Sequence, residues 1–288
     1  MKHVILFIDL IRLKKPIGFM LLFWPCAWGL TVAYNFEKNI DLYFFYLILF
    51  LLGSILMRSA GCIVNDIFDK DFDKKVSRTK NRPIASGKIS IKLGLFYSCI
   101  LCLIALSVLL NFNYFTIILA LGSMPLAFTY PLMKRFTYWP QLFLGITFNY
   151  GLILGWTAIY GQIDIIPIIF YFGAIFWTLG YDTIYGYQDI KDDEIIGLKS
   201  TSIKFKDNAK KFLILCYLLL ISVLLIIGYM MNFTKYYYYF LLIPFLHLFF
   251  YQIRIFNLNK PSNCLIAFKS NNLFGLLVFI NILIGKNF

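Results

Sequence analysis

The chain has 288 residues, of which 60% are hydrophobic and only 14% are charged. A soluble domain carries about 25% charged residues, so this composition excludes an ordinary soluble protein and indicates a protein that crosses a membrane several times. The net charge of +13 would suggest a nucleic-acid partner in a soluble protein, but in a membrane protein it reports topology. We therefore expect the lipid bilayer, and no nucleic acid, as the surroundings of this chain.

Nine apolar segments follow one another along the chain, each about 20 residues long, which is the length that spans a bilayer as a helix. Before them, MKHVILFIDLIRLKKP is short, amphipathic and basic, and predicts an interfacial helix. The expected spans are 17–35, 42–64, 93–111, 114–131, 138–159, 163–182, 212–232, 236–256 and 265–285. Because the third span and the fourth are joined only by Asn111, Phe112 and Asn113, a count of eight is the alternative. The predicted fold is an all-α polytopic membrane protein.

Lysine and arginine are distributed very unequally between the loops. With nine spans, the N-terminus and every second loop share one side of the membrane, and that side carries 22 basic residues against three on the other. This asymmetry obeys the positive-inside rule. It predicts a multi-pass protein of the bacterial inner (cytoplasmic) membrane, with its active site on the cytoplasmic side.

A carboxylate-rich segment, MRSAGCIVNDIFDKDFD, ends the second span at residues 57–73. Asn65, Asp69 and Asp73 recur every four residues, so on a helix they share one face, and Asp66 adds to the local charge. Carboxylates this close repel one another unless a cation lies among them, and hard oxygen ligands suit Mg²⁺. The segment therefore predicts a magnesium site, with Asn65, Asp66, Asp69 and Asp73 as its candidate ligands.

A second acidic segment, YDTIYGYQDIKDDE, ends the sixth span at residues 181–194. Here Tyr185, Asp189 and Asp193 repeat the four-residue spacing, with Asp182 beside them. One such segment alone would indicate a solvated acidic loop. Nine of the 14 acidic residues fall in the two segments, however, and both segments end apolar helices, where charge is costly and usually functional. The presence of two acidic segments therefore favours a site in which both hold Mg²⁺ ions and the ions bind a diphosphate between the segments.

Basic residues near the two segments are candidates for the phosphate oxygens that the metal ions leave free. Arginine binds such oxygens bidentately and lysine binds them as a point charge. The candidates are Arg78, Arg82, Lys134, Arg135 and Lys199. The positive-inside bias alone explains the loop lysines equally well. Arg58 is unusual because it lies inside the second span, about two helical turns before Asn65.

The two acidic segments end the second and the sixth span, and a basic loop follows each of them. This echo predicts one transmembrane domain with two pseudo-related four-helix halves, about 17–131 and 138–256, and a ninth helix. The halves would face each other across a central cavity, which polar residues inside spans such as Arg58, Asn149 and the run 269–272 also favour. Charge between two halves is also typical of a transporter or channel, which is the alternative from another functional class.

Both acidic segments also resemble a known family. MRSAGCIVNDIFDKDFDKKVSRTKNRPIASGKIS resembles the N-D-x-x-D-x-x-x-D region of the UbiA-type intramembrane prenyltransferases. YDTIYGYQDIKDDEIIGLKSTSI resembles their D-x-x-Y-x-x-x-D-x-x-D-D region. RLKKPIGFMLLFWPCAWGL and YPLMKRFTYWPQLFLG are similar to the same family, so the resemblance spans most of the chain and is loosest over 233–288.

The resemblance implies nine helices around a central cavity and Mg²⁺-dependent cleavage of a polyprenyl diphosphate. It further implies that the prenyl group is transferred to the 3-position of 4-hydroxybenzoate, with release of pyrophosphate, in ubiquinone biosynthesis. Relatives that prenylate naphthoate, haem, chlorophyll or glycerol phosphate share these metal motifs. The choice of acceptor therefore rests on the resemblance alone.

The resemblance also implies roles for individual residues. The ligands of the metal or the diphosphate would be Asn65, Asp69, Asp73, Asp189 and Asp193. Tyr185 would lie beside the reacting centre, and Asp182 near enough to help deprotonate the phenol or the ring. The acceptor is an anion, and burying its carboxylate is costly unless a cation receives it. Arg58 is the candidate for that cation, and Arg135 is the alternative.

Overall fold

The computed structural model describes residues 2–37, 39–258 and 260–287. Over these residues the regular secondary structure is helical, without a strand, which confirms the all-α prediction. The first half comprises α1 (Lys2–Leu10), α2 (Ile17–Ala33), α3 (Ile40–Phe68), α4 (Lys70–Asp73), α5 (Ile91–Leu109), α6 (Tyr114–Thr129), η1 (Tyr130–Leu132) and α7 (Met133–Phe136). The second half comprises α8 (Pro140–Tyr160), α9 (Ile165–Gly186), α10 (Ile190–Ile195), α11 (Thr201–Lys204), η2 (Lys206–Asn208), α12 (Ala209–Met230), α13 (Lys235–Leu246), η3 (His247–Gln252, a π-helix), α14 (Ile253–Ile255), α15 (Pro261–Lys269) and α16 (Asn271–Asn287).

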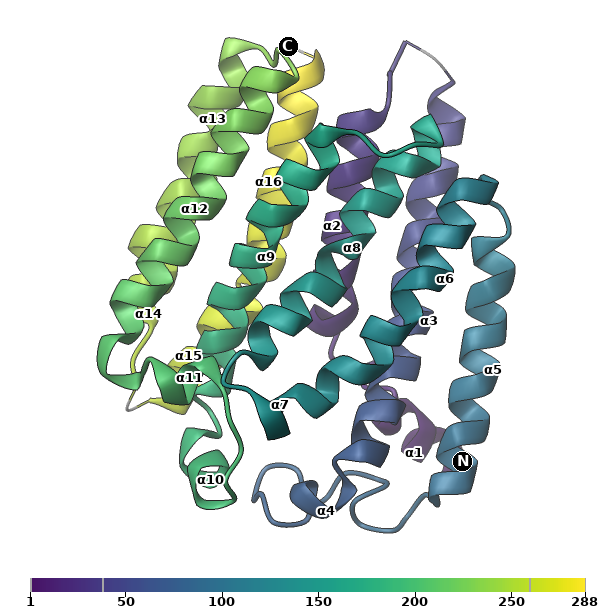
Figure 1. Ribbon diagram of the computed structural model, residues 1–288, viewed down its shortest axis with the longest axis vertical. Helices are drawn as coiled ribbons and strands as arrows, with labels where there is room; N and C mark the ends of the chain where they lie inside the picture. The colour runs from purple at the N-terminus through teal and green to yellow at the C-terminus, as the bar shows by residue number, and fades with distance from the viewer. Residues whose placement is uncertain (1, 38, 259, 288) are drawn as a thin grey trace.

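The long helices form one bundle whose axes run roughly along the long dimension of the molecule (Figure 1). Eight helical segments are long and apolar enough to cross a membrane, and the 17-residue α2 is a shorter apolar helix. They follow the nine predicted spans to within a few residues at each end. The third and fourth spans are separate helices, α5 and α6, as the count of nine requires.

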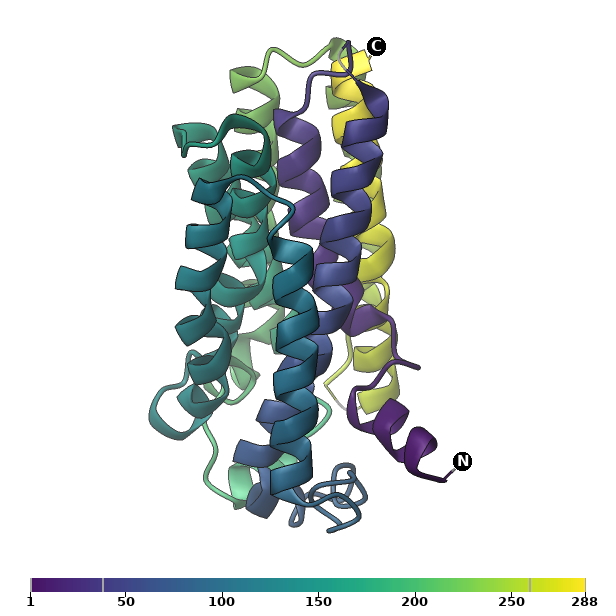
Figure 2. The same cartoon turned by 90° about the vertical axis from the view of Figure 1, so that its right-hand side faces the viewer.

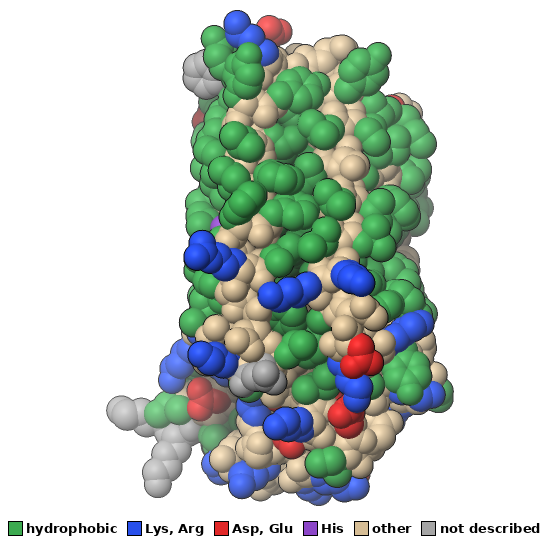
Figure 3. Space-filling model, turned by 90° about the vertical axis from the view of Figure 1, so that its left-hand side faces the viewer, with side chains coloured by type: hydrophobic (Ala, Val, Ile, Leu, Met, Phe, Trp, Pro, Cys, Tyr) green, Lys and Arg blue, Asp and Glu red, His purple; other side chains and the backbone are tan. Residues whose placement is uncertain are grey.

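Charged side chains gather at one end of the bundle. The side shown in Figure 3 is covered by hydrophobic side chains in its upper part, and most of its lysine, arginine and acidic side chains lie in its lower half. The short helices α4 and α10, which carry the two acidic segments, both lie at this end, as does α1 (Figure 1). Figure 2 shows that α1 is inclined to the long helices, beside the bundle, as expected of an interfacial helix. We call this the charged end.

Close packing between α2 and α8 depends on glycine. A Cβ atom on Gly29 of α2 would lie 2.0 Å from the carbonyl oxygen of Leu152 on α8, and one on Gly155 would lie 2.4 Å from the carbonyl oxygen of Cys26. No side chain fits in these places. Small residues are what allow two membrane helices to approach this closely, so these glycines fix α2 against α8.

On its other side α2 packs against α16. The indole nitrogen of Trp28 donates a hydrogen bond of 2.9 Å to the carbonyl oxygen of Gly275. Lys286 donates to the carbonyl oxygens of Thr31 (3.1 Å) and Val32 (2.7 Å), in the last turn of α2. Carbonyls in the last turn of a helix have no partner within that helix, so Lys286 of α16 satisfies groups that would otherwise be exposed to lipid.

Two of the polar residues that were predicted to mark a cavity join helices instead. Asn149 on α8 donates a hydrogen bond of 2.7 Å to the hydroxyl of Thr178 on α9. The side-chain oxygen of Asn271 accepts one of 2.8 Å from the indole of Trp177. Hydrogen bonds between membrane helices explain these residues without a cavity. The division of the chain into two related halves stays a prediction.

Candidate active site

The first acidic segment lies where α3 ends and α4 begins, at the charged end. Asp69 and Asp73 are buried, and each carboxylate has a basic partner from another part of the chain. Lys134 lies 2.5 Å from Oδ2 of Asp69, and Arg82 lies 2.8 Å from Oδ2 of Asp73. The second oxygen of Asp69, Oδ1, is buried and has no hydrogen-bond partner. A buried carboxylate oxygen without a partner is costly, and a bound cation would remove that cost.

Asp66 is the most deeply buried acid of this segment, at 1% exposure. It forms ion pairs with Arg12 and with Arg82, the latter at 3.2 Å. Arg12 follows α1 and has a positive φ of 55°, in the left-handed region that side chains other than glycine rarely adopt. Sequence reasoning missed Arg12 as part of this site, because a basic residue in an interfacial segment carries no signal of its partner.

The loop that follows the first acidic segment reaches the second one through Arg78. Arg78, in the loop after α4, binds both carboxylate oxygens of Asp189, with a distance of 2.8 Å between Nε and Oδ1. It also donates a hydrogen bond of 3.3 Å to the hydroxyl of Tyr185, and its guanidinium carbon lies 5.6 Å from the centroid of that ring. Burial alone would lower the pKa of Arg78, but its hydrogen bonds to Asp189 hold that pKa above the ordinary value.

Two carboxyl groups in the site titrate above their usual range. Burial, together with the charge of Asp189, raises the pKa of Asp193 to about 6, although Lys134 and Arg78 act in the opposite direction. Burial also raises the pKa of Asp69, again opposed by Lys134. Acids whose ionised forms are disfavoured by burial and by one another are groups that a divalent cation would stabilise in the charged form.

The oxygen ligands can be compared with what Mg²⁺ requires. In the described residues no three His, Cys, Asp or Glu side chains are close enough to hold a metal ion by themselves. Mg²⁺, however, is usually bound through one or two carboxylates together with water and substrate phosphates. The unpartnered oxygen of Asp69, with Asp189 and Asp193 across the site, fits that requirement.

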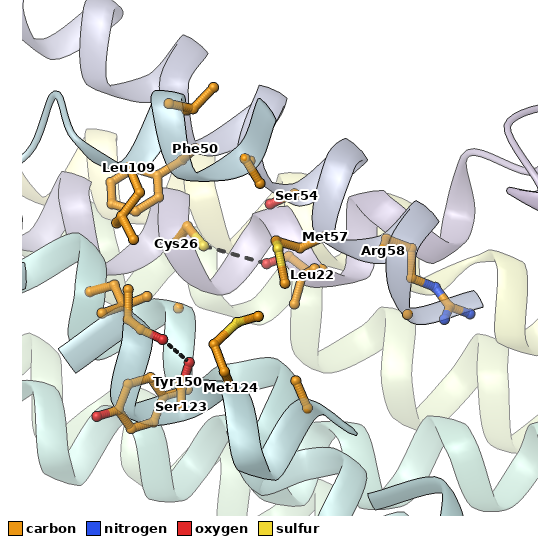
Figure 4. A pocket seen from close by; sticks show the side chains of 18 of the residues that line it. Leu22, Cys26, Phe50, Ser54, Met57, Arg58, Leu109, Ser123, Met124 and Tyr150 are labelled. Atoms are coloured by element: carbon orange, nitrogen blue, oxygen red, sulfur yellow. Dashed lines mark hydrogen bonds between the residues drawn. The ribbon is translucent and has the colours of Figure 1, made fainter. Parts of the chain in front are cut away.

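A cavity of about 220 Å³ extends from the charged end into the apolar part of the bundle, between α2, α3, α5, α6 and α8. Figure 4 shows Arg58 at one end of it and Phe50 and Leu109 at the other. Two aromatic residues of α8, Phe148 and Tyr150, both line it. The guanidinium carbon of Arg58 lies 5.6 Å from the Phe148 ring centroid, and its buried Nε has no hydrogen-bond partner.

Asp182 and Tyr185 reach the same region from α9. Asp182 lies near enough to Arg58 for their charges to interact, although no ion pair joins them in the described structure. The Tyr185 ring packs 4.4 Å from the ring of Phe268 on α15, which fixes its orientation. Of the three residues predicted to be catalytic, Arg58 lines the cavity, and Asp182 and Tyr185 lie close enough to Arg58 for electrostatic interaction.

Two residues predicted to bind the diphosphate contact the backbone instead. Arg135 donates a hydrogen bond of 2.6 Å to the carbonyl oxygen of Phe68, at the end of α3. The ammonium of Lys199 donates one of 3.3 Å to the carbonyl oxygen of Phe136, and its own N–H donates to the carbonyl oxygen of Lys134. Neither side chain has a carboxylate partner in the described structure. Their contacts hold the segment that carries Lys134.

The signature of the UbiA prenyltransferase family matches residues 22–282 of this chain. The chain belongs to the UbiA prenyltransferase family. A Bos taurus protein named "4-hydroxybenzoate polyprenyltransferase, mitochondrial" is 45% identical over 97% of this chain and 75% of its own length. "4-Hydroxybenzoate geranyltransferase 2" from Lithospermum erythrorhizon is 42% identical over 100% of this chain and 92% of its own.

Solved structures of UbiA homologues have the same fold. The structure of a homologue from Archaeoglobus fulgidus bound to GPP and Mg²⁺ superimposes with a TM-score of 0.75, over 98% of this chain and all of that one. The two sequences are only 16% identical, so this likeness concerns the fold alone. Family membership confirms the prediction of a prenyltransferase with many membrane helices.

The prediction of a bacterial inner membrane is contradicted by the relatives. Those from Bos taurus, Homo sapiens and Arabidopsis thaliana, which are 41 to 45% identical to this chain, are all named mitochondrial. The physical reason for the error is that the positive-inside rule distinguishes the two faces of a bilayer but does not say which membrane the bilayer belongs to. The multi-pass character of the chain is unaffected by this correction.

Proposed function

We propose that this protein transfers a prenyl group from a polyprenyl diphosphate to the 3-position of 4-hydroxybenzoate and releases pyrophosphate, as a step of ubiquinone biosynthesis. The observation that carries the proposal is that Arg78, in the loop that follows the first acidic segment, pairs with Asp189 of the second, while the buried cation of Arg58 lines the cavity between the helices. The acceptor is supported by the names of relatives that are more than 40% identical over nearly the whole chain.

Mg²⁺ is the proposed cofactor, and it would be held from both sides of the site. Its ligands would be Asn65, Asp69 and Asp73 from the first segment and Asp189 and Asp193 from the second. When bound, Mg²⁺ supplies positive charge that neutralises the diphosphate as it departs. Asp66 was predicted as a further ligand, but its ion pairs with Arg12 and Arg82 favour a role in positioning Arg82.

The basic residues of the site change partners in this mechanism. Lys134 and Arg78 pair with Asp69 and Asp189 in the structure. With Mg²⁺ on these carboxylates, both cations would be available to the phosphate oxygens, Arg78 through two parallel hydrogen bonds. The positive charges that pair with these carboxylates would therefore also serve the substrate. Arg82 pairs with Asp73 and adds its positive charge to the electrostatic field at the diphosphate site.

The chemistry after pyrophosphate leaves depends on residues at the mouth of the cavity. The face of Tyr185 is covered by Arg78, and it becomes available to an allylic cation when Arg78 turns to the phosphates. Arg58, with an unpartnered Nε in an apolar wall, receives the carboxylate of the acceptor. The ring forms a bond to the prenyl carbon and then loses a proton, for which Asp182 is the nearby base.

Pyrophosphate release by the purified protein in detergent tests this proposal. Geranyl diphosphate should yield pyrophosphate only when Mg²⁺ and an acceptor are present, with 4-hydroxybenzoate preferred over a hydroxynaphthoate. A transporter would release no pyrophosphate under these conditions. A clear preference for another acceptor would contradict the assignment of 4-hydroxybenzoate while leaving the reaction class in place.

A further inference from the structure

A second hollow lies on the outer surface of the bundle, apart from the cavity beside the candidate active site. One of its walls is formed by α13 and η3, and the other by α15 and α16. Its volume is about 850 Å³, and in the described structure it shares no lining residue with the cavity. We call it the outer groove, and among the residues that line it are Ile243, Leu246, Tyr251, Lys269, Leu273 and Leu277.

A buried polar network holds the two walls of the outer groove in place. Gln252 ends the π-helix η3; it accepts a hydrogen bond of 2.7 Å from the hydroxyl of Tyr217 and donates one of 3.1 Å to the side-chain oxygen of Asn271. Tyr251, the residue before Gln252, lies on the groove, where its ring stacks on that of His247 with 5.3 Å between the centroids. The groove is thus a fixed feature of the bundle, and short π-helices are frequent at functional sites.

Two polar groups that line the outer groove lack a partner. Lys269 ends α15 and is exposed, and its ammonium makes no hydrogen bond or ion pair within the described residues. The hydroxyl of Tyr251 makes no hydrogen bond in that part of the chain either. Both residues belong to helical segments that are apolar enough to cross a membrane. A charge in such a segment is costly and usually functional, so we expect a ligand for Lys269.

The depth of Lys269 in the membrane follows from its distance to Lys286. The two lysines are 17 residues apart, which corresponds to roughly 26 Å along a helix. Lys286 caps α2 at the end of the bundle opposite the charged end. Because the hydrocarbon core of a bilayer is about 30 Å thick, Lys269 lies near its boundary on the charged side, where lipid phosphates are found. Tyrosines such as Tyr251 are enriched at the same level.

We propose that the outer groove binds an anionic phospholipid, whose phosphate accepts hydrogen bonds from Lys269 and Tyr251. One acyl chain lies deeper in the membrane, against Ile243 of α13 and Leu273 and Leu277 of α16. Basic pockets between membrane helices are where anionic lipid headgroups bind. A zwitterionic headgroup carries its own cation, which competes with Lys269 for the phosphate, so the groove favours a lipid with a net negative charge.

Titration of phosphatidylglycerol into the purified protein in detergent tests the headgroup site. Binding is measured by native mass spectrometry, and a saturating amount should raise the Tm by roughly 3 °C, more than phosphatidylcholine does. Lys269→Gln keeps the length of the side chain but removes its charge, so the affinity for phosphatidylglycerol should fall by roughly tenfold or more. The matched control is Lys211→Gln, which removes an exposed lysine of α12 outside the groove and should leave the affinity unchanged.

A larger side chain in the groove tests the place of the acyl chain. Leu273→Trp fills part of the groove and should weaken the binding of phosphatidylglycerol several-fold. Leu276→Trp is the matched control, because Leu276 is 38% exposed on the same helix but does not line the groove. This control should bind the lipid as the unmodified protein does.

Four results would overturn the inference. Equal affinity for phosphatidylcholine and phosphatidylglycerol, unchanged in Lys269→Gln, would mean that only unspecific surrounding lipid is bound. An equal loss in Lys211→Gln would assign the effect to the positive charge of the whole charged end. The same rise in Tm with inorganic phosphate alone would mean that the groove binds a free anion instead of a lipid. Unchanged affinity in Leu273→Trp would exclude the groove as the place of the acyl chain.

Discussion

Replacing Arg78 should reduce catalysis strongly but reduce the stability of the fold only slightly. The residue binds Asp189 through two hydrogen bonds and covers Tyr185, yet its side chain is 38% exposed. Replacing it with glutamine removes the charge but keeps a side chain of similar length. The free side chain of Asp189 then faces solvent in part, at 16% exposure, and is not left in a dry interior.

The expected magnitudes follow from that exposure. An ion pair that solvent screens contributes about 1 kcal/mol or less to folding, so Arg78→Gln should lower the Tm by only a few degrees, about 4 °C at most. Loss of a preorganised donor to the departing diphosphate should cost about 3 kcal/mol in the transition state. That is roughly a hundredfold in kcat/KM, because each 1.36 kcal/mol corresponds to a factor of ten.

The assay combines pyrophosphate release with thermal unfolding in the same detergent. Lys206→Gln is the matched control, because it removes another ion pair at the charged end, the exposed pair between Lys206 and Glu194 at 2.7 Å. The control should behave like the unmodified protein in both measurements. Full activity of Arg78→Gln, or a loss of activity that merely tracks a large loss of stability, would refute the role given to Arg78.

Three further outcomes are expected from the same site. Asp69→Asn and Asp189→Asn should each nearly abolish turnover. The helical circular dichroism should be retained and the Tm should change by only a few degrees, because asparagine keeps the shape and relieves carboxylate repulsion. Near-normal activity at saturating Mg²⁺ would rule out a shared metal site. Arg58→Lys and Arg58→Ala should raise the KM for 4-hydroxybenzoate far more than that for the prenyl diphosphate, and an equal rise in both would assign Arg58 to the diphosphate or to structure. The pKa of Asp193 is raised to about 6, so its carboxylate takes up a proton as the pH falls through that value. The apparent affinity for Mg²⁺ should therefore fall by up to about tenfold per pH unit below pH 6. An affinity that does not change between pH 5 and 7 would exclude Asp193 as a ligand.

The helices and the acidic segments could be predicted from local patterns in the sequence. A run of about 20 apolar residues becomes a membrane helix whatever its neighbours are, because its backbone must be hydrogen-bonded internally in lipid. The four-residue spacing of Asp69 and Asp73 likewise requires only a helix to bring them onto one face. Both features depend on residues close together in the chain.

The pairings within the site could not be predicted in this way. Lys134 meets Asp69 from 65 residues away, and Arg78 meets Asp189 from 111 residues away. Every basic residue of the loops fits the positive-inside rule equally well, so the sequence does not say which of them turns inward. The polar residues Asn149 and Asn271 show the same limit, because a hydrogen bond between helices and a cavity-lining position look alike in the sequence.

The contact of α2 with α16 bears on how the protein assembles in the membrane. Lys286 and Thr31 are 255 residues apart, so α2 must enter the bilayer long before the helix that caps its last turn has been synthesised. Until then Trp28 and the terminal carbonyls of α2 face lipid or a temporary neighbour. Membrane helices insert first and associate afterwards, and contacts between segments so distant in the chain form late. The helix α2, which lines the cavity with Leu22 and Cys26, thus gains the partner that caps its last turn only after α16 has been synthesised.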